Sequence, residues 1–274
     1  MTDDELRSLS HPNESVAFDV AVLVVTPVVA VALLIVAQTM PAILLILAGA
    51  AASIWFSLQI AQSYLIANAL RVSPLNFPEI YALLQESKRV LGYHKKVDIY
   101  IVSEGTINAF LSRFFATKFI VLNSELVDDM VEKDTLPQIQ WVIARFVGAL
   151  RAKHDKLFFL RVLVSGIESV KIFNLFLLPY ERAVQYSGDQ IGLAVCMNLE
   201  QPMLVLQKLL VGNTLSGRVS REGVLEQKQS MGLPVVVTGW FSTHPHTIDR
   251  YINLLQFAER RYPEMYKRYI NSHS

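Results

Sequence analysis

The sequence predicts an α+β protein, mainly helical, in which an N-terminal transmembrane hairpin precedes one cytoplasmic domain. From Val20 to Leu70 the chain contains no Asp, Glu, Lys or Arg, and this run is long enough for two spans of roughly 20 residues each. The chain from residue 71 onward has ordinary composition, with apolar residues at helical spacing and two short β-type runs. We therefore expect a cytoplasmic tail over 1–19, a hairpin over 20–70 and a domain over 71–274.

The composition excludes some classes of function. Of the 274 residues, 52% are hydrophobic and 18% charged, and the formal net charge of +1 gives no indication of a nucleic-acid partner. The single Cys196 excludes an internal disulfide and fits a reducing compartment. Acidic residues before position 20 occupy the place where a signal peptide needs basic residues. We expect the apolar run to be a retained anchor in the lipid bilayer.

The apolar run divides into two helices of the hairpin. We expect the first over about Val20–Val36 and the second over about Pro41–Ile60, joined by a turn at residues 38–41. The turn is uncharged, whereas five basic residues follow the second span between positions 71 and 96. The positive-inside rule then predicts a multi-pass protein of the inner (cytoplasmic) membrane with both termini in the cytoplasm. Beyond Ile60 the residues become polar without charge, so the second helix is expected to continue into the domain.

Small residues on the second helix would let another helix approach closely. Ala48 with Ala52, and Gly49 with Ser53, form two small-x-x-x-small pairs. Two explanations stay open at this point. The pairs serve packing inside the hairpin, or they contact a partner protein or a second copy in a homo-oligomer.

The domain begins with a helix that starts at Pro78 and ends at Gly92. β-Branched and aromatic runs then predict strands at Val97–Val102 and Lys118–Asn123, with a link between them. A helix follows over 139–154, preceded by a capping box of Thr135 and Gln138. Three other segments complete the pattern: the apolar stretch 157–178 as an interfacial or domain-buried segment, 213–232 as a mobile surface loop, and the charged run 128–134 as a solvated turn.

Four short motifs occur in a specific order. They are "INAF" at 107–110, "ARFVGALRAKH" at 144–154, "ERAVQYSGDQIG" at 181–192 and "STHPHTIDR" at 242–250. Together with the preceding hairpin, they make the chain similar to the HtpX-like membrane zinc metallopeptidases, which are relatives of the CAAX prenyl endopeptidases. The resemblance implies a zincin-like (gluzincin) cytoplasmic domain with a small β-sheet, and it covers nearly the whole chain.

The residues that carry the chemistry of this family are replaced. The family's zinc site uses two His one helical turn apart, a Glu ligand and a second Glu as the base. The matching positions hold Arg145 and Ala149, Gln185, and Phe146 respectively. No other His, Cys, Asp or Glu cluster in the sequence has metal-ligand spacing. We therefore expect no catalytic residue, no metal ligand and no cofactor, so that the family zinc is absent.

Other family positions are retained: Asn108, Gly148, His154, Asp189, Gly192, His244, Pro245 and Arg250. The resemblance implies that His244 lies near the former catalytic centre, where it contacts substrate. An alternative is that His244 and Pro245 only cap the following helix. We expect binding residues at Asn108, His244 and Arg250. We also expect them on an exposed strand edge to which a partner peptide adds; its residues are Phe119, Ile120, Val121 and Leu122.

Charge predicts what fills the former metal position. Asp189 matches an aspartate that lies close to the dication in the family, so it needs a positive neighbour, while Gln185 has lost the charge of the ligand glutamate. We expect the Arg145 guanidinium to donate two hydrogen bonds to Asp189 and a third to the Gln185 carbonyl. If the pair is buried, removing one partner should cost on the order of 3–5 kcal/mol.

Three hypotheses of function follow from the sequence. The leading one is a membrane-anchored pseudopeptidase that serves as a binding, scaffold or regulatory subunit for a protein or peptide partner, such as a membrane-protein complex. The second is an active zinc metalloendopeptidase of membrane-protein quality control. The third is a purely structural membrane subunit.

Overall fold

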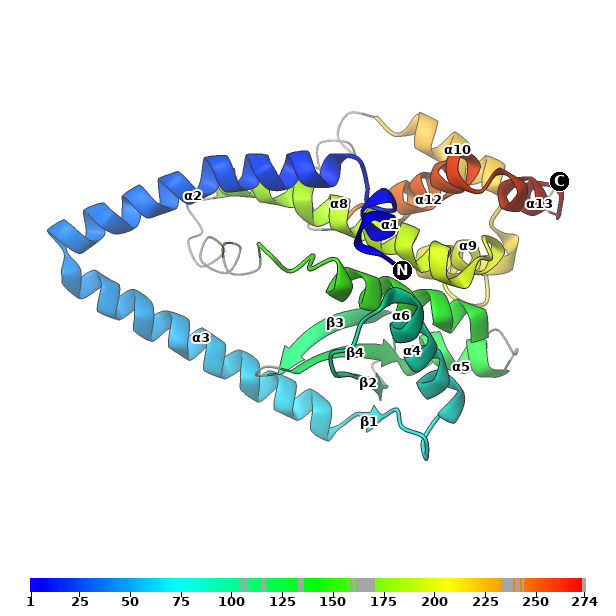
Figure 1. Cartoon of the computed structure of the whole chain (residues 1–274), viewed down its shortest axis with the longest axis horizontal. Coiled ribbons are helices and arrows are strands. Elements are labelled where there is room, and N and C mark those ends of the chain that lie inside the picture. Colours follow the sequence, from blue (N-terminus) through cyan, green and yellow to red (C-terminus); the bar gives the residue numbers. More distant parts are fainter. Residues whose placement is uncertain are drawn as a thin grey trace.

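The computed structural model describes residues 1–103, 105, 108–114, 117–132, 136–157, 160, 171–232, 239, 242 and 244–272. The chain forms a V-shaped pair of long helices that leads into a domain of helices around a small sheet (Figure 1). The fold is thus mainly helical with one small mixed sheet, as the sequence predicts.

The two long helices are α2 (Asn13–Thr39) and α3 (Pro41–Ala67). Each has 27 residues and is about 40 Å long, which exceeds the roughly 30 Å core of a bilayer. Most of their large apolar side chains are exposed, so both helices are long and apolar enough to cross a membrane. They separate from the turn toward the domain (Figure 1), and no side chain lies within 4 Å of a Cβ built on Gly49. Gly49 therefore does not serve packing inside the hairpin.

The first residues of the chain are folded against the domain. Helix α1 (Asp3–Ser8) has a capping box, and Leu6 and Leu9 enter the main core. The Met1 amino group donates to the carbonyl of Val90 at 2.8 Å, and Asp3 pairs with Arg151. These contacts attach the first residues to the domain. Residues 13–19 belong to helix α2.

The sheet has the strand order β1-β2-β4-β3. The strands are β1 (Leu70–Arg71), β2 (Val97–Val102), β3 (Ala109–Phe114) and β4 (Thr117–Asn123). Strand β4 is parallel to β2 and antiparallel to β3. The predicted strands β2 and β4 are confirmed, whereas β3 lies in the segment that we expected to be a link.

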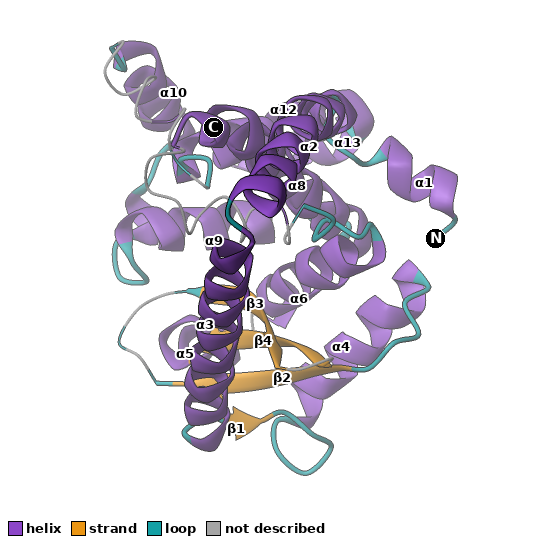
Figure 2. Cartoon of the chain, turned by 90° about the vertical axis from the view of Figure 1, so that its left-hand side faces the viewer, coloured by secondary structure: helices purple, strands orange, loops and turns teal. Residues whose placement is uncertain are grey.

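The expected exposed edge at Phe119–Leu122 is wrong. These four residues are all buried in β4, which is paired on both sides. Alternation along β4 sends Phe119 and Val121 toward the end of α3, and Ile120 and Leu122 into the main core. Among the described strands, the two edges of the sheet are β1 and β3 (Figure 2).

Six helices pack around the sheet and against one another (Figure 1). They are α4 (Pro78–Leu91), α5 (Ser124–Glu132), α6 (Leu136–Arg151), α8 (Lys171–Cys196), α9 (Glu200–Val211) and α12 (Thr247–Arg261). The retained glycines explain how closely α6 and α8 approach. A Cβ on Gly148 would clash with the Ile191 side chain, and one on Gly192 would lie 2.8 Å from the Trp141 ring. Close contact of these two helices fixes the geometry of the site described below.

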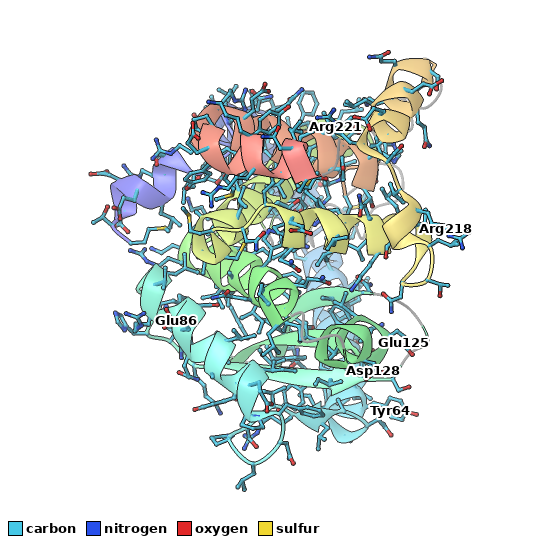
Figure 3. The ribbon with its side chains drawn as sticks, turned by 90° about the vertical axis from the view of Figure 1, so that its right-hand side faces the viewer. Tyr64, Glu86, Glu125, Asp128, Arg218 and Arg221 are labelled. Atoms are coloured by element: carbon cyan, nitrogen blue, oxygen red, sulfur yellow. The ribbon has the colours of Figure 1, made fainter. Side chains whose placement is uncertain are left out.

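Three segments differ from the expectations or lie partly outside the described residues. Residues 213–232, predicted as a surface loop, contain the 3-10 helix η2 (Ser216–Arg218) and helix α10 (Arg221–Ser230). The Ser220 side chain caps α10 by accepting a hydrogen bond from the Gly223 amide. Asp128 is exposed on helix α5 and not in a turn, on the face that Figure 3 shows. The capping residue Thr135 and residues 161–170 of the apolar stretch lie outside the described part of the chain. From residue 171 the stretch is helical, and Leu177 packs against α2.

The C-terminal helix α13 (Pro263–Ser272) packs on α12.

Candidate functional site

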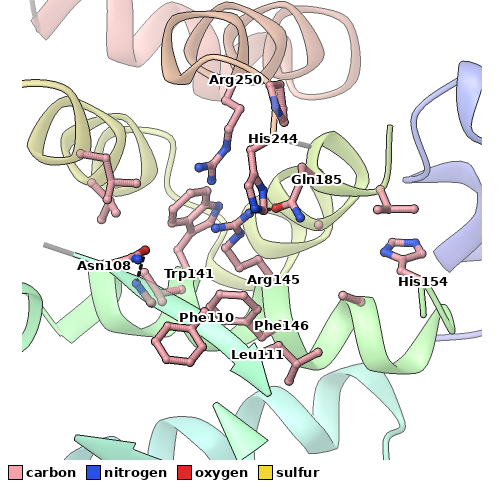
Figure 4. Close-up of a pocket in the computed structure, with 18 of the residues that line it drawn as sticks. Asn108, Phe110, Leu111, Trp141, Arg145, Phe146, His154, Gln185, His244 and Arg250 are labelled. Carbon is pink, nitrogen blue, oxygen red and sulfur yellow. Dashed lines mark hydrogen bonds between the residues drawn. The ribbon is translucent and has the colours of Figure 1, made fainter. Parts of the chain in front are cut away.

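A cleft of about 550 Å³ lies between the free strand β3, the helices α6 and α8 and the start of α12 (Figure 4). All four positions that match the family's metal site line it, although Gln185 comes 40 residues after Arg145. The residues that line the cleft include Asn108, Phe110, Leu111, Trp141, Arg145, Phe146, Ala149, His154, Glu181, Gln185, His244 and Arg250. The structure thus brings the sequence-predicted positions together.

The Arg145 side chain occupies the centre of this cleft. Its Nε lies 3.0 Å from Oδ1 of Asp189, and its Nη2 donates to Oε1 of Gln185 at 2.9 Å. The guanidinium carbon is 5.4 Å from the ring centroid of Trp141 and 5.0 Å from that of Phe146. Helix α6 supplies all three side chains, with Trp141 four residues before Arg145 and Phe146 next to it, so the guanidinium contacts two aromatic rings.

Asp189 is shared between two arginines. Arg250, on the first turn of α12, donates from Nε and Nη2 to both carboxylate oxygens at 2.8 and 2.9 Å. The predicted ion pair between Arg145 and Asp189 is present, but the bidentate hydrogen bonds come from Arg250 instead. The sequence predicts Arg250 only as a binding residue, because its pairing with Asp189 depends on the packing of α12 beside α8.

Burial makes the electrostatics of this group unusual. The side chains of Arg145, Arg250 and Asp189 are 9%, 11% and 1% exposed. Burial, followed by the nearby charge of Arg250, lowers the pKa of Arg145 to about 10, and Asp189 opposes this shift only in part. Two guanidinium groups therefore share one carboxylate, and the group carries a surplus positive charge.

Trp141 helps to position Asp189, a role that the sequence pattern did not reveal. Its indole Nε1 donates to the backbone carbonyl of Asp189 at 3.1 Å. The ring also lies against Gly192, one turn further along α8. The signal in the sequence is spacing, because Trp141 stands four residues before Arg145 on the same face of α6.

Comparison with protein families agrees with the motif order. Residues 130–258 match the model of peptidase family M48. This match supports the family membership that the motifs indicate. The matched range contains α6 and α8 and most of α12, which supply Arg145, Gln185, Asp189 and Arg250. Neither a curated protein nor a solved structure gives a significant match.

The M48 metal position in this chain does not have the donor set that zinc requires. A catalytic zinc site needs three ligands from His, Glu or Asp, and Arg145, Ala149 and Gln185 supply none of these. Asp189, the carboxylate that contacts Arg145, is also engaged by Arg250. Within the described part of the chain, no group of three or more His, Cys, Asp or Glu side chains could hold a metal ion. The residues present therefore do not fit the M48 zinc.

The retained M48 residues have different environments. His244 is exposed and lines the same cleft as Arg145 and Gln185 (Figure 4). It is not the helix cap, because α12 begins at Thr247 with His246 at the N-cap position. Asn108 lies at the start of β3, where its Oδ1 accepts from the Ala109 amide at 2.8 Å.

His154 also lines the cleft, and its side chain is buried. Its Nε2 lies 3.3 Å from Oε1 of Glu14 at the start of α2. Glu14 in turn accepts a hydrogen bond from Ser187 of α8, and the His11 amide donates to the same hydroxyl at 2.8 Å. These contacts attach the beginning of the first long helix directly to the wall of the cleft.

Proposed function

We propose that this chain is a membrane-anchored, catalytically inactive M48 family member that binds a protein or peptide partner in its cleft, as a binding, scaffold or regulatory subunit. The observation that carries this proposal is the arginine at the metal position. Arg145 is fixed there by Asp189, Gln185 and two aromatic rings, so an ion pair stands where the family has a metal. A permanent cation at this point opposes binding of a dication.

Loss of the catalytic base supports the same proposal. In the family a glutamate takes the proton from the metal-bound water, and the matching residue here is Phe146, which has no proton acceptor. Restoring one ligand would therefore not restore hydrolysis. The alternative, an active zinc metalloendopeptidase, requires a different ligand set.

The open edge of β3 supports binding of an extended peptide. Among the described strands, β3 pairs with β4 alone, and its residues Ala109, Phe110 and Leu111 line the cleft. An added strand would hydrogen-bond to the free side of β3 while its side chains face Arg145 and Phe146. This edge replaces the one that we expected at Phe119–Leu122.

The proposed location is the inner membrane, with both termini in the cytoplasm. A second cavity, of about 700 Å³, supports this orientation, because it is lined by His94, Lys95, Lys96, Lys118, Arg151, Lys153 and Lys156. Lys156 lies over the ring of Phe18 at 5.4 Å, two residues before the uncharged run begins. Basic residues at the base of a span favour the cytoplasmic side.

Two measurements test this function. Elemental analysis of the purified full chain should find no stoichiometric zinc, whereas one zinc per chain would favour the active peptidase. A photo-crosslinking amino acid at Leu111 in native membranes should capture a discrete partner, and one at the exposed Glu226 of α10 serves as the control. Crosslinks from Glu226 but none from Leu111 would contradict a binding cleft and favour a purely structural subunit.

A further inference from the structure

The arginine group in the cleft lacks one negative charge. Arg145 and Arg250 both contact Asp189, and Gln185 adds a neutral amide. A buried site with a surplus cation is stabilised by an anion that enters it. Both arginines line the cleft, so a ligand that enters the cleft can reach them.

The geometry leaves hydrogen-bond donors for such an anion. The bonds that Arg145 makes to described residues use Nε and Nη2, and those of Arg250 use the same two nitrogens. Within the described part of the chain, the Nη1 group of each arginine has no partner and can donate to a ligand. Two guanidinium groups that converge on one carboxylate are well suited to a second one, because a planar carboxylate accepts parallel N–H bonds.

The rest of the cleft indicates what carries the anion. The free backbone of β3 borders it, and Phe110, Leu111 and Phe146 supply an apolar wall. A peptide that adds to β3 and ends at the arginines would place its last apolar side chain against this wall. A phosphate group carries about 1.5 to 2 negative charges and exceeds the single surplus charge.

We propose that the cleft binds the C-terminal carboxylate of a partner chain, held by Arg145 and Arg250, with an apolar last residue against Phe110 and Phe146. The proposal rests on the proposed function, since it names the part of the partner that enters the cleft. The former peptidase site would then be a receptor for a chain end, in which a guanidinium takes the place of a metal.

Glu181 provides an internal check. Its side chain lines the same cleft one helical turn before Gln185, yet the charges that shift the pKa of Arg145 are those of Arg250 and Asp189. A carboxylate that lines the cleft repels a second carboxylate, so Glu181 should oppose the entry of one. Glu181→Gln is the matched control variant, because it removes a charge from the cleft and leaves the arginine group intact.

The test compares fluorescent heptapeptides that end in Leu and differ only in their terminus, as free acid or as amide. Anisotropy titrations use the full chain in detergent. The free acid should bind wild type about 10- to 100-fold more tightly than the amide, as expected for charge-assisted hydrogen bonds. Arg250→Lys, which keeps the charge but loses the fork, should reduce this preference, and Glu181→Gln should keep or increase it.

The outcomes separate this proposal from the function on which it rests. Equal binding of acid and amide would overturn the carboxylate site while peptide binding in the cleft stands. Binding of neither peptide, in a protein that also gives no crosslink from Leu111, would overturn the proposed function itself. An amidated peptide with an internal Asp or phosphoserine that binds as tightly as the free acid would show an anion site without preference for a chain end, which also overturns the proposal. Because the acid and amide are compared on wild type, these results do not depend on the folding of a variant.

Discussion

Asp189→Asn should destabilise the domain more than any substitution of a single arginine in the cleft. The carboxylate accepts two hydrogen bonds from Arg250 and lies 3.0 Å from Nε of Arg145. Asparagine has nearly the same shape but no charge, so both guanidinium groups would stay buried without a counter-charge. Leaving a buried charge unpaired costs about 3–5 kcal/mol of the free energy of unfolding.

Removing Arg145 has a smaller predicted cost than the roughly 3–5 kcal/mol expected from the sequence alone. Asp189 keeps its bidentate partner Arg250 when Arg145 is lost, so no carboxylate is stranded. Burial already disfavours the charged form of Arg145, and an apolar side chain of similar length is often neutral in such a position. Arg145→Met should therefore change stability by about 1 kcal/mol, the value of the lost bond to Gln185.

Thermal unfolding in detergent, followed by tryptophan fluorescence, measures both effects. A cost of 3–5 kcal/mol corresponds to a decrease in Tm of about 6–20 °C for a domain of this size. The double variant Asp189→Asn/Arg145→Met should recover part of the loss, because one of the two uncompensated charges is gone. An Asp189→Asn protein as stable as wild type, or an Arg145→Met protein less stable than Asp189→Asn, would refute the shared-carboxylate argument.

Three further predictions concern the metal, the N-terminus and the helix contact. Arg145→His should leave the chain without proteolytic activity and without stoichiometric zinc, since Phe146 and Gln185 are unchanged; hydrolysis of casein by this variant would contradict it. Burial lowers the pKa of His11, so the unfolded chain takes up the proton more readily and stability should fall as pH decreases below about 6.5. Hydrogen exchange of residues 1–12 at pH 7.5 and 5.5 measures this loss, which should be absent in His11→Phe. Gly192→Ala places a Cβ against the Trp141 ring and should cost about 1–3 kcal/mol; an unchanged Tm would show that the ring moves aside.

The sequence by itself determined the features that depend on local pattern. An uncharged run from Val20 to Leu70 indicates two long apolar helices in almost any context, because their composition alone decides where they are stable. Short β-branched runs gave β2 and β4, and the motif order gave the family and the positions around Arg145. These features need no knowledge of distant contacts.

Tertiary structure decided which groups meet. Strand β3 was missed, and the buried β4 was taken for an edge, because strand order is set by pairing between segments that sequence patterns treat separately. The sharing of Asp189 by Arg145 and Arg250 follows from the positions of α6 and α12 on either side of α8, which the close contacts at Gly148 and Gly192 help to fix. A charge pattern in the sequence shows that a carboxylate needs a cation, but only the packed helices determine how many cations reach it.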